Sequence, residues 1–271
     1  MTNSEAAPLY PSTLAPDRYY QGKLILTLSQ LSTDTLAKQT GLTERITQNL
    51  LPTFSKLFSL SSTSSVLEIA SGYGVHSLIY SKAFPDITIQ PTECDEFNRG
   101  KINETCREVS KGNEEGNDRG GVREALGLNV MEETSWEKLQ GVERREGKEG
   151  EAKYDLVIGH NFIHMLPFPD GPRSIFRNLL KLDLVSRSKG LIAFYGPFKH
   201  DEGFYSEGDV AFDKEISSRP SSYPLGLRSI DAIARIAEEE GWEFVKKVPM
   251  PVGNWVLLYK VKGAQVDLDG V

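Results

Sequence analysis

Hydrophobic residues follow two spacings along the chain from about residue 65 onward. Short apolar runs such as 65–70 are bounded by turn residues, which is typical of strands in a buried parallel sheet. Between these runs, apolar residues recur at helical spacing, as in Leu78, Ile79 and Ala83. The predicted strands are 65–70, 87–92, 123–130, 154–159, 190–195, 243–249 and 254–262, and the predicted helices are 75–84, 96–110, 171–184, 208–218 and 229–241.

Strands that alternate with helices predict an α/β fold with a mainly parallel, seven-stranded sheet and helices on both faces. The last two strands are expected to form a hairpin pair. A helix is expected after Thr43, with a kink at Pro52. The charged, glycine-rich segments 111–121 and 141–153 are expected to be loops. The predicted division is an extension at 1–42, in which 21–41 has helical spacing, one domain at 43–262 and a polar tail at 263–271.

The first predicted strand carries an acid, Glu68, and ends in the turn Gly72-Tyr73-Gly74 before a helix. Such a unit places a nucleotide-like ligand at the carboxyl end of the strand, because glycine lets the ligand approach the backbone and the helix N-terminus offers free N–H groups. A dinucleotide site requires a third glycine, and Ser77 stands in its place. S-adenosylmethionine (SAM) has no pyrophosphate and does not need that glycine. The pattern therefore favours SAM over a dinucleotide.

Composition narrows the class of partner. The 271 residues carry a net charge of −7, and no run of Lys and Arg suggests a phosphate-binding stripe, so no nucleic-acid partner is expected. Cys94 and Cys106 form no metal-ligand or disulfide spacing, and no metal centre is predicted. No apolar stretch approaches the ~18 residues of a membrane span, and no signal peptide is recognised. A cytoplasmic protein without a membrane partner is expected.

Several sequence blocks resemble one branch of the class I SAM-dependent methyltransferase-like proteins, the poorly characterised branch that includes human methyltransferase-like protein 26. The resemblance covers about residues 44–261 and implies the Rossmann-like class I methyltransferase fold, SAM as cofactor and methyl transfer as activity. The matching blocks are Leu67–His76, Gln90–Asp95, Asn161–His164, Tyr195–Phe198, Phe212-Asp213, Gly226–Arg228 and Met250-Pro251 with Asn254.

Glu93 ends the second predicted strand, where a carboxylate can accept hydrogen bonds from both ribose hydroxyls. The family has Asp at this position. Asp95 is the competing candidate, and its alternative role is to cap the following helix. Glu68 is expected either to help hold the amino end of SAM or to anchor the glycine loop.

The resemblance implies further cofactor contacts. Asn129 stands where the family usually has an Asp that accepts from the adenine amino group, and an amide oxygen can still accept. His160 is expected beside the methionine part, and His76 is expected to orient the glycine loop or a carboxylate. The full set expected to bind SAM is Glu68, Ala70, Gly72, Tyr73, Gly74, His76, Glu93, Asn129 and His160.

Three residues near the ends of the fourth and fifth predicted strands are expected to face the reacting methyl group: Asn161, His164 and Tyr195. Methyl transfer needs in-line alignment and a deprotonated acceptor. His164 is the candidate general base because the ordinary histidine pKa is near neutral. Its alternative role is a hydrogen bond to a loop carbonyl.

The expected activity is methyl transfer from SAM to a small-molecule or peptide-like acceptor. The aromatic-rich segment 197–227 is expected to form a lid that selects the acceptor. An alternative is a SAM-binding fold without transfer activity that serves as an interaction module. A nicotinamide-dependent oxidoreductase is disfavoured by Ser77 and Pro197.

Overall fold

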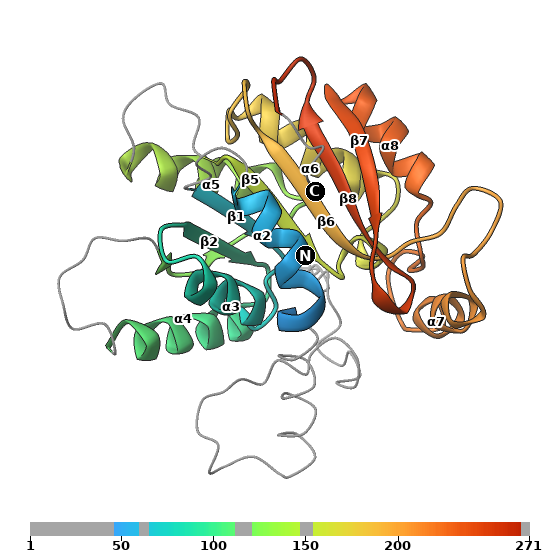
Figure 1. Ribbon diagram of the computed structural model, residues 1–271, viewed down its shortest axis with the longest axis horizontal. Coiled ribbons are helices and arrows are strands. Elements are labelled where there is room, and N and C mark those ends of the chain that lie inside the picture. Colours follow the sequence, from blue (N-terminus) through green and yellow to red (C-terminus); the bar gives the residue numbers. More distant parts are fainter. Residues whose placement is uncertain (1–45, 60–64, 112–120, 147–153, 267–271) are drawn as a thin grey trace, which may run out of the picture.

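The computed structural model describes residues 46–59, 65–111, 121–146 and 154–266, and the predicted extension at 1–42 lies outside them. Strands and helices alternate through most of this part of the chain (Figure 1). The strands are β1 (Ser65–Ile69), β2 (Thr88–Glu93), β3 (Gly121–Val122), β4 (Leu126–Gly127), β5 (Leu156–His160), β6 (Leu191–Pro197), β7 (Trp242–Pro249) and β8 (Asn254–Val261). The helices are α2 (Leu51–Ser59), α3 (Val75–Ala83), α4 (Glu96–Lys111), α5 (Glu133–Glu146), α6 (Asp170–Lys181), α7 (Glu207–Ser217) and α8 (Ile230–Glu239), with a π-helical turn η1 (Ile46–Leu50) and 3-10 turns η2 (Ile163–Met165) and η3 (Pro251–Gly253).

The described strands form one mixed sheet in the order β3-β2-β1-β5-β6-β8-β7, with β4 paired to β2 (Figure 1). Neighbours from β3 to β6 run parallel, and β8 runs antiparallel to both β6 and β7. The predicted α/β fold and the C-terminal hairpin are confirmed. The sheet has eight strands rather than seven because the strand predicted at 123–130 is divided into two short pieces, β3 and β4.

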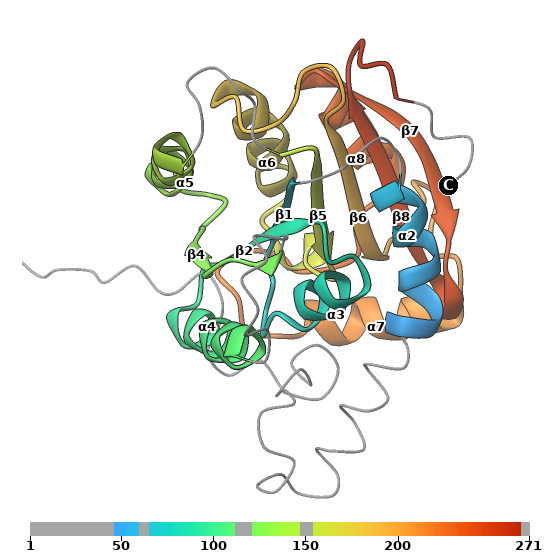
Figure 2. The same ribbon diagram turned by 60° about the vertical axis from the view of Figure 1, so that its left-hand side comes forward.

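Two hydrophobic cores lie on opposite faces of the sheet (Figure 2). Alternate residues of β1 show why, since successive side chains of a strand point to opposite faces. Leu67 and Ile69 pack with side chains of α5, α6 and α8, whereas Val66 packs with side chains of η1, α2 and α3. The side chain of Glu68 shares the face of Val66, and it is therefore directed toward α2 and α3.

Two boundary predictions need correction or qualification. Helix α5 was not predicted, and it continues to Glu146, into the segment 141–153 that was expected to be a loop; residues 147–153 lie outside the described ranges. The helix expected after Thr43 is present as η1 and α2, and Pro52 occupies the second position of α2, where its missing N–H is tolerated. Within the described residues, no helix is long and apolar enough to cross a membrane.

Candidate active site

The carboxyl ends of β1, β2, β5 and β6 meet at one edge of the sheet because these strands are parallel neighbours. Backbone strain gathers at this edge. Ala70, directly after β1, has φ of 56°, and Asn161, directly after β5, has φ of 55°. Non-glycine residues rarely adopt this conformation, and it is enriched at functional sites. Ligands of open α/β sheets bind at such an edge.

The predicted glycine turn between β1 and α3 is present, and both of its glycines adopt a positive φ, a backbone conformation that other residues rarely adopt. Gly72 has φ of 58° and Gly74 has φ of 76°. The two positions differ in surroundings: a Cβ built on Gly72 meets no atom within 4 Å, whereas one on Gly74 lies 3.2 Å from Ile102 of α4. Gly74 is therefore a packing position, and Gly72 leaves its backbone open to a ligand.

Glu93 joins the end of β2 to the glycine turn. Its Oε2 accepts a hydrogen bond from Gly72 N at 2.8 Å, and its Oε1 accepts one from Asp95 N at 3.1 Å. The carboxyl group is almost completely buried, and this burial raises its pKa although both hydrogen bonds lower it. The Cys94 thiol also donates to Oε1, at 3.4 Å. Because a carboxylate has about four acceptor sites, Oε2 keeps the capacity for a further hydroxyl donor.

Asp95 and Asn129 make local contacts at the same edge. Asp95 precedes α4, and its Oδ1 accepts from Asn98 N at 2.8 Å, which is the capping geometry that the sequence offered as its alternative role. Asn129 follows β4; its Oδ1 accepts from Met131 N at 3.1 Å and its Nδ2 donates to Glu132 at 2.7 Å. The amide is half-buried and stabilises the turn into α5.

Beneath the glycine turn lies a buried polar group that we call the Glu68 cluster: Glu68, His76, Ser77, Tyr80 and His160. Glu68 Oε1 lies 3.3 Å from His160 Nδ1 and 3.9 Å from His76 Nδ1. Ser77 Oγ donates to Glu68 Oε2, and Tyr80 Oη lies 3.0 Å from His160 Nε2. The two imidazoles stack with centroids 3.9 Å apart and planes 7° apart.

Burial controls protonation in the Glu68 cluster. It raises the pKa of Glu68, against the lowering effect of His76 and Ser77. It lowers the pKa of His160 to about 3, and burial together with His160 lowers the pKa of His76 to about 3. Both imidazoles are thus neutral at physiological pH.

Sequence reasoning missed Ser77, Tyr80 and Phe54 as parts of this region. Ser77 was considered only as a missing glycine, although it lies next to His76 and one helical turn before Tyr80. Phe54 of α2 stacks on Tyr80 with centroids 5.1 Å apart and lies 5.2 Å from the His160 ring. Tyr80 lies four residues after His76 in the same predicted helix, so its place beside His76 could have been predicted from the sequence. Phe54 comes from a different helix and reaches the site only through tertiary packing.

Two of the three residues expected to face the methyl group are joined by a hydrogen bond, and the third packs against the segment 197–227. Asn161 and Tyr195 are neighbours, because Asn161 N donates to the Tyr195 carbonyl at 2.7 Å. The Tyr195 ring lies 6.1 Å from the His160 ring, at the border of the Glu68 cluster. His164 lies in η2, is only 2% exposed and packs edge-on against Phe212 of α7 at 5.5 Å.

The environment of His164 disfavours its charged form. Burial lowers its pKa from the ordinary 6.5 to about 3, with further lowering by Arg228 and Arg219. Its backbone carbonyl accepts from Gly226 N at 3.2 Å. His164 is therefore a neutral imidazole that joins η2 to the segment 197–227.

The segment 197–227 is anchored across the edge of the sheet. Tyr223 Oη donates to the Met165 carbonyl at 3.1 Å, and Arg228, just after the segment, donates to the Leu166 carbonyl at 2.9 Å. The pKa of Tyr223 is raised by burial and by Cys94, which lies just after β2. The segment thus starts at β6 and brings the Tyr223 phenol near Cys94 at the end of β2.

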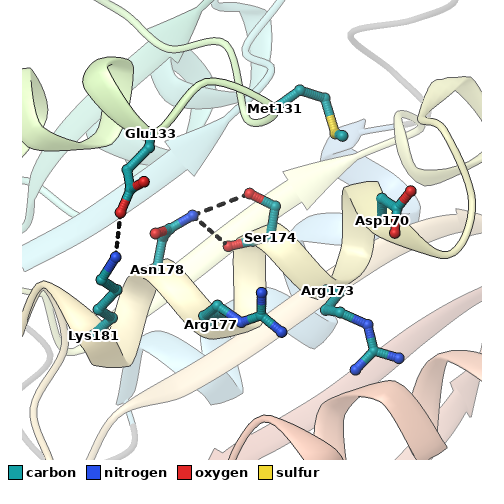
Figure 3. Close-up of a pocket in the computed structure, with 8 residues that line it drawn as sticks. All are labelled: Met131, Glu133, Asp170, Arg173, Ser174, Arg177, Asn178 and Lys181. Carbon is teal, nitrogen blue, oxygen red and sulfur yellow. Dashed lines mark hydrogen bonds and ion pairs between the residues drawn. The ribbon is translucent and has the colours of Figure 1, made fainter.

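A surface hollow of about 280 Å³ lies elsewhere, between α5 and α6 (Figure 3). Its basic groups already have partners: Lys181 pairs with Glu133, Arg177 pairs with Glu240 at 2.8 Å, and Arg173 pairs with Glu239 at 2.7 Å. None of the predicted site residues lines it. We therefore assign no ligand to it. The lining residues are Met131, Glu133, Asp170, Arg173, Ser174, Arg177, Asn178 and Lys181.

Solved structures with a similar fold are class I SAM-dependent methyltransferases. The methyltransferase SibL in its apo form matches with a TM-score of 0.59 and 13% identity over 84% of this chain and 58% of SibL. An O-methyltransferase family protein from Burkholderia thailandensis matches with a TM-score of 0.57 and 14% identity over 84% and 60%. The chain therefore spans less than two thirds of the length of these two proteins.

A third neighbour has a similar length. Magnesium protoporphyrin IX methyltransferase (ChlM) from Synechocystis PCC 6803, with bound SAH, matches with a TM-score of 0.53 and 12% identity over 86% of this chain and 89% of ChlM. At such identities the likeness establishes the class I methyltransferase fold. The sequence itself matches one family model over residues 40–261, and the chain accordingly belongs to the family described as "Protein of unknown function (DUF938)".

Proposed function

We propose that the protein binds SAM at the carboxyl ends of β1 and β2 and transfers its methyl group to a small-molecule or peptide-like acceptor. The observation that carries the proposal is the pairing of Gly72 with Glu93. Gly72 offers open space at a left-handed backbone position, and its N–H is fixed by a buried carboxylate. The class I fold supports the same location. The sequence blocks also lead us to propose membership of the branch that includes human methyltransferase-like protein 26.

The roles of the residues follow from their positions. Glu93 would accept from the ribose hydroxyls, with Gly72 and Tyr73 close to the nucleoside, and Asn129 would accept from the adenine amino group. Glu68, Ala70, Gly74, His76 and His160 would shape the methionine side. The raised pKa of Tyr73, caused by burial and by the carboxylates of Asp95 and Glu93, keeps its phenol protonated beside the site.

SAM, when bound, supplies an electrophilic methyl group on sulfur. The chain has to exclude water, align the acceptor and accept its proton where the acceptor is an alcohol or ammonium. Asn161 and Tyr195 occupy the strand ends that would face the acceptor. His164 would take the proton as a neutral imidazole, although a pKa of about 3 makes it a weak base.

We further propose that segment 197–227 is the lid of the acceptor site. Tyr223 is half-buried and lies near Cys94, so the segment reaches from β6 toward β2. Replacing the segment with a short loop should abolish transfer while SAM affinity is retained. Loss of both properties together would mean that the segment is a structural arm.

Calorimetric titration with SAM tests cofactor binding. Gly72→Val should abolish binding because its side chain enters the open space, and Glu93→Gln should weaken binding by about 2 kcal/mol, the scale of hydrogen bonds to a charged group. Asp95→Asn is the matched control, because an amide can still cap α4, and it should retain SAM affinity. Unchanged affinity in a folded Gly72→Val protein contradicts the proposed site.

Methyl transfer is tested separately with radiolabelled SAM and a panel of amine, alcohol, thiol and peptide acceptors. His164→Ala should lower turnover by ~10²–10⁴-fold without a change in SAM affinity if His164 is the base. Binding of SAM without transfer to any acceptor would favour the interaction-module alternative. A near-normal rate for His164→Ala would remove His164 from the catalytic group and leave alignment as the mechanism.

A further inference from the structure

We propose that the Glu68 cluster is a binding site for a divalent transition-metal ion, of which Zn²⁺ is the best chemical match. The inference goes beyond the proposed function and does not depend on it. Two imidazoles and one carboxylate meet at a single point, with one ring nitrogen of His76, one of His160 and a carboxylate oxygen of Glu68 all within 4.8 Å of one another. This donor set suits Zn²⁺, and it leaves room for an exchangeable ligand.

The distances fit an ion of this size. Ligand atoms about 2.0–2.2 Å from a tetrahedral zinc ion lie ~3.3–3.6 Å apart. Glu68 Oε1 and His160 Nδ1 are 3.3 Å apart, and His76 Nδ1 is 3.9 Å from the same oxygen. Glu68 and His160 are thus already at ligand spacing, and His76 has to move closer and turn to complete the set.

His160 supplies an independent observation. It is 6% exposed, and its Nδ1 makes no hydrogen bond within the described part of the chain although Glu68 Oε1 lies 3.3 Å away. The two atoms are close but not aligned as donor and acceptor. A buried polar atom without a partner is energetically unfavourable, so its presence needs an explanation. A bound cation would use the Nδ1 lone pair.

The remaining atoms of two ligands are already held in the way metal ligands require. Tyr80 Oη lies 3.0 Å from His160 Nε2, so an Nε2–H that donates to it would leave Nδ1 as the free lone pair. Ser77 Oγ donates to Glu68 Oε2, which leaves Oε1 toward the histidines. Such outer partners fix the tautomer and orientation of metal ligands.

His76 is the adjustable member of the set. Its side chain is 16% exposed, compared with 1% for Glu68 and 2% for His160. An ion lies in the plane of each imidazole that binds it, whereas the two rings now stack in parallel. Metal binding should therefore rotate the His76 ring out of the stack, and this side would hold the exchangeable position.

The experiment uses the full chain without an affinity tag, stripped with a chelator and kept free of SAM. Co²⁺ is added as a spectroscopic probe and then displaced by Zn²⁺. We expect one equivalent of Co²⁺ to give visible d–d absorption typical of four- or five-coordination, and one equivalent of Zn²⁺ to abolish it. No d–d absorption together with no calorimetric Zn²⁺ binding would overturn the proposal, and so would a thiolate-to-cobalt charge-transfer band, which would place the ion on cysteine.

Three variants identify the ligands, each checked for folding by circular dichroism. His76→Gln and Glu68→Gln should weaken Zn²⁺ binding by about 100-fold or more, and Tyr80→Phe should weaken it by about 10–100-fold through loss of the outer partner. His200→Gln, which removes a histidine outside the cluster, is the matched control. If Glu68→Gln does not fold, the Zn²⁺ affinities of His76→Gln and Tyr80→Phe test the site instead. Unchanged affinity in His76→Gln, or an equal loss in His200→Gln, would contradict the site. SAM titration of the same proteins reports separately on the proposed function.

Discussion

Replacing His164 with glutamine should make the stability of the protein less sensitive to acid. His164 is 2% exposed, and its pKa in the folded protein is about 3, compared with an ordinary value of 6.5. The unfolded chain therefore binds a proton at this residue between these two pKa values, and the folded chain does not. Stability from this residue is fully present above pH 6.5 and is lost as the pH falls toward 3.

The magnitude follows from the two pKa values. At about pH 5, protonation of His164 in the unfolded state should lower the free energy of unfolding by about 2 kcal/mol relative to about pH 8. The contribution depends little on the folded pKa, provided that this stays below about 4. In the glutamine variant this term is absent, whereas every other titrating group is retained.

Urea unfolding at about pH 8 and about pH 5, followed by tryptophan fluorescence, gives the four free energies needed. Wild type should lose about 2 kcal/mol more than His164→Gln between the two pH values. A constant offset from repacking against Phe212 cancels in this comparison. An equal loss in both proteins would refute the reasoning and show that His164 titrates as an exposed histidine in the fold.

Three further predictions concern stability. Gly74→Ala should destabilise the protein more than Gly72→Ala, since both strain a positive φ by about 1–2 kcal/mol but only the former meets Ile102; equal thermal shifts would contradict this comparison. Trp242→Phe should lower the free energy of unfolding by about 1–3 kcal/mol, because the indole donates to the buried Phe176 carbonyl at 2.9 Å, and urea unfolding would measure the loss. Ser229→Ala should cost about 1–2 kcal/mol in urea unfolding, because the hydroxyl accepts from Ala232 N and donates to Asp201, while Ser222→Ala, at an exposed loop position, should change stability little.

The local spacing of hydrophobic and turn residues was sufficient to predict most of the strands and helices. The buried run before Gly72 and the helical spacing after it predict β1 and α3 because period and turn chemistry agree there. The break between β3 and β4 was not predictable, since the apolar residues from 122 to 130 are compatible with one continuous strand. Helix α5 was missed altogether, and its end was assigned to a loop because a highly charged helix end has the same composition as a loop.

Some residues of the candidate site could likewise be predicted from the sequence, and others could not. Gly72 and Glu93 were found because each stands at a fixed distance from a predicted strand end, and the structure joins them by a hydrogen bond. The burial of His164 against Phe212 was not predictable, because it depends on how η2 packs against α7. The convergence of Glu68, His76 and His160, which we propose to bind a metal ion, was also not predictable from cysteine spacing, because these residues come from two strands and a helix.

The order of strands at the C-terminal side of the sheet has a consequence for biosynthesis. β8 follows β7 in the chain but lies between β6 and β7, with seven residue pairs to each neighbour. Until β8 has left the ribosome, β6 presents an unpaired edge and β7 has no neighbour in the sheet. Exposed strand edges promote association between chains. A nascent or truncated chain that ends before Asn254 should therefore depend on chaperones and aggregate, although every residue proposed to bind SAM has already been made.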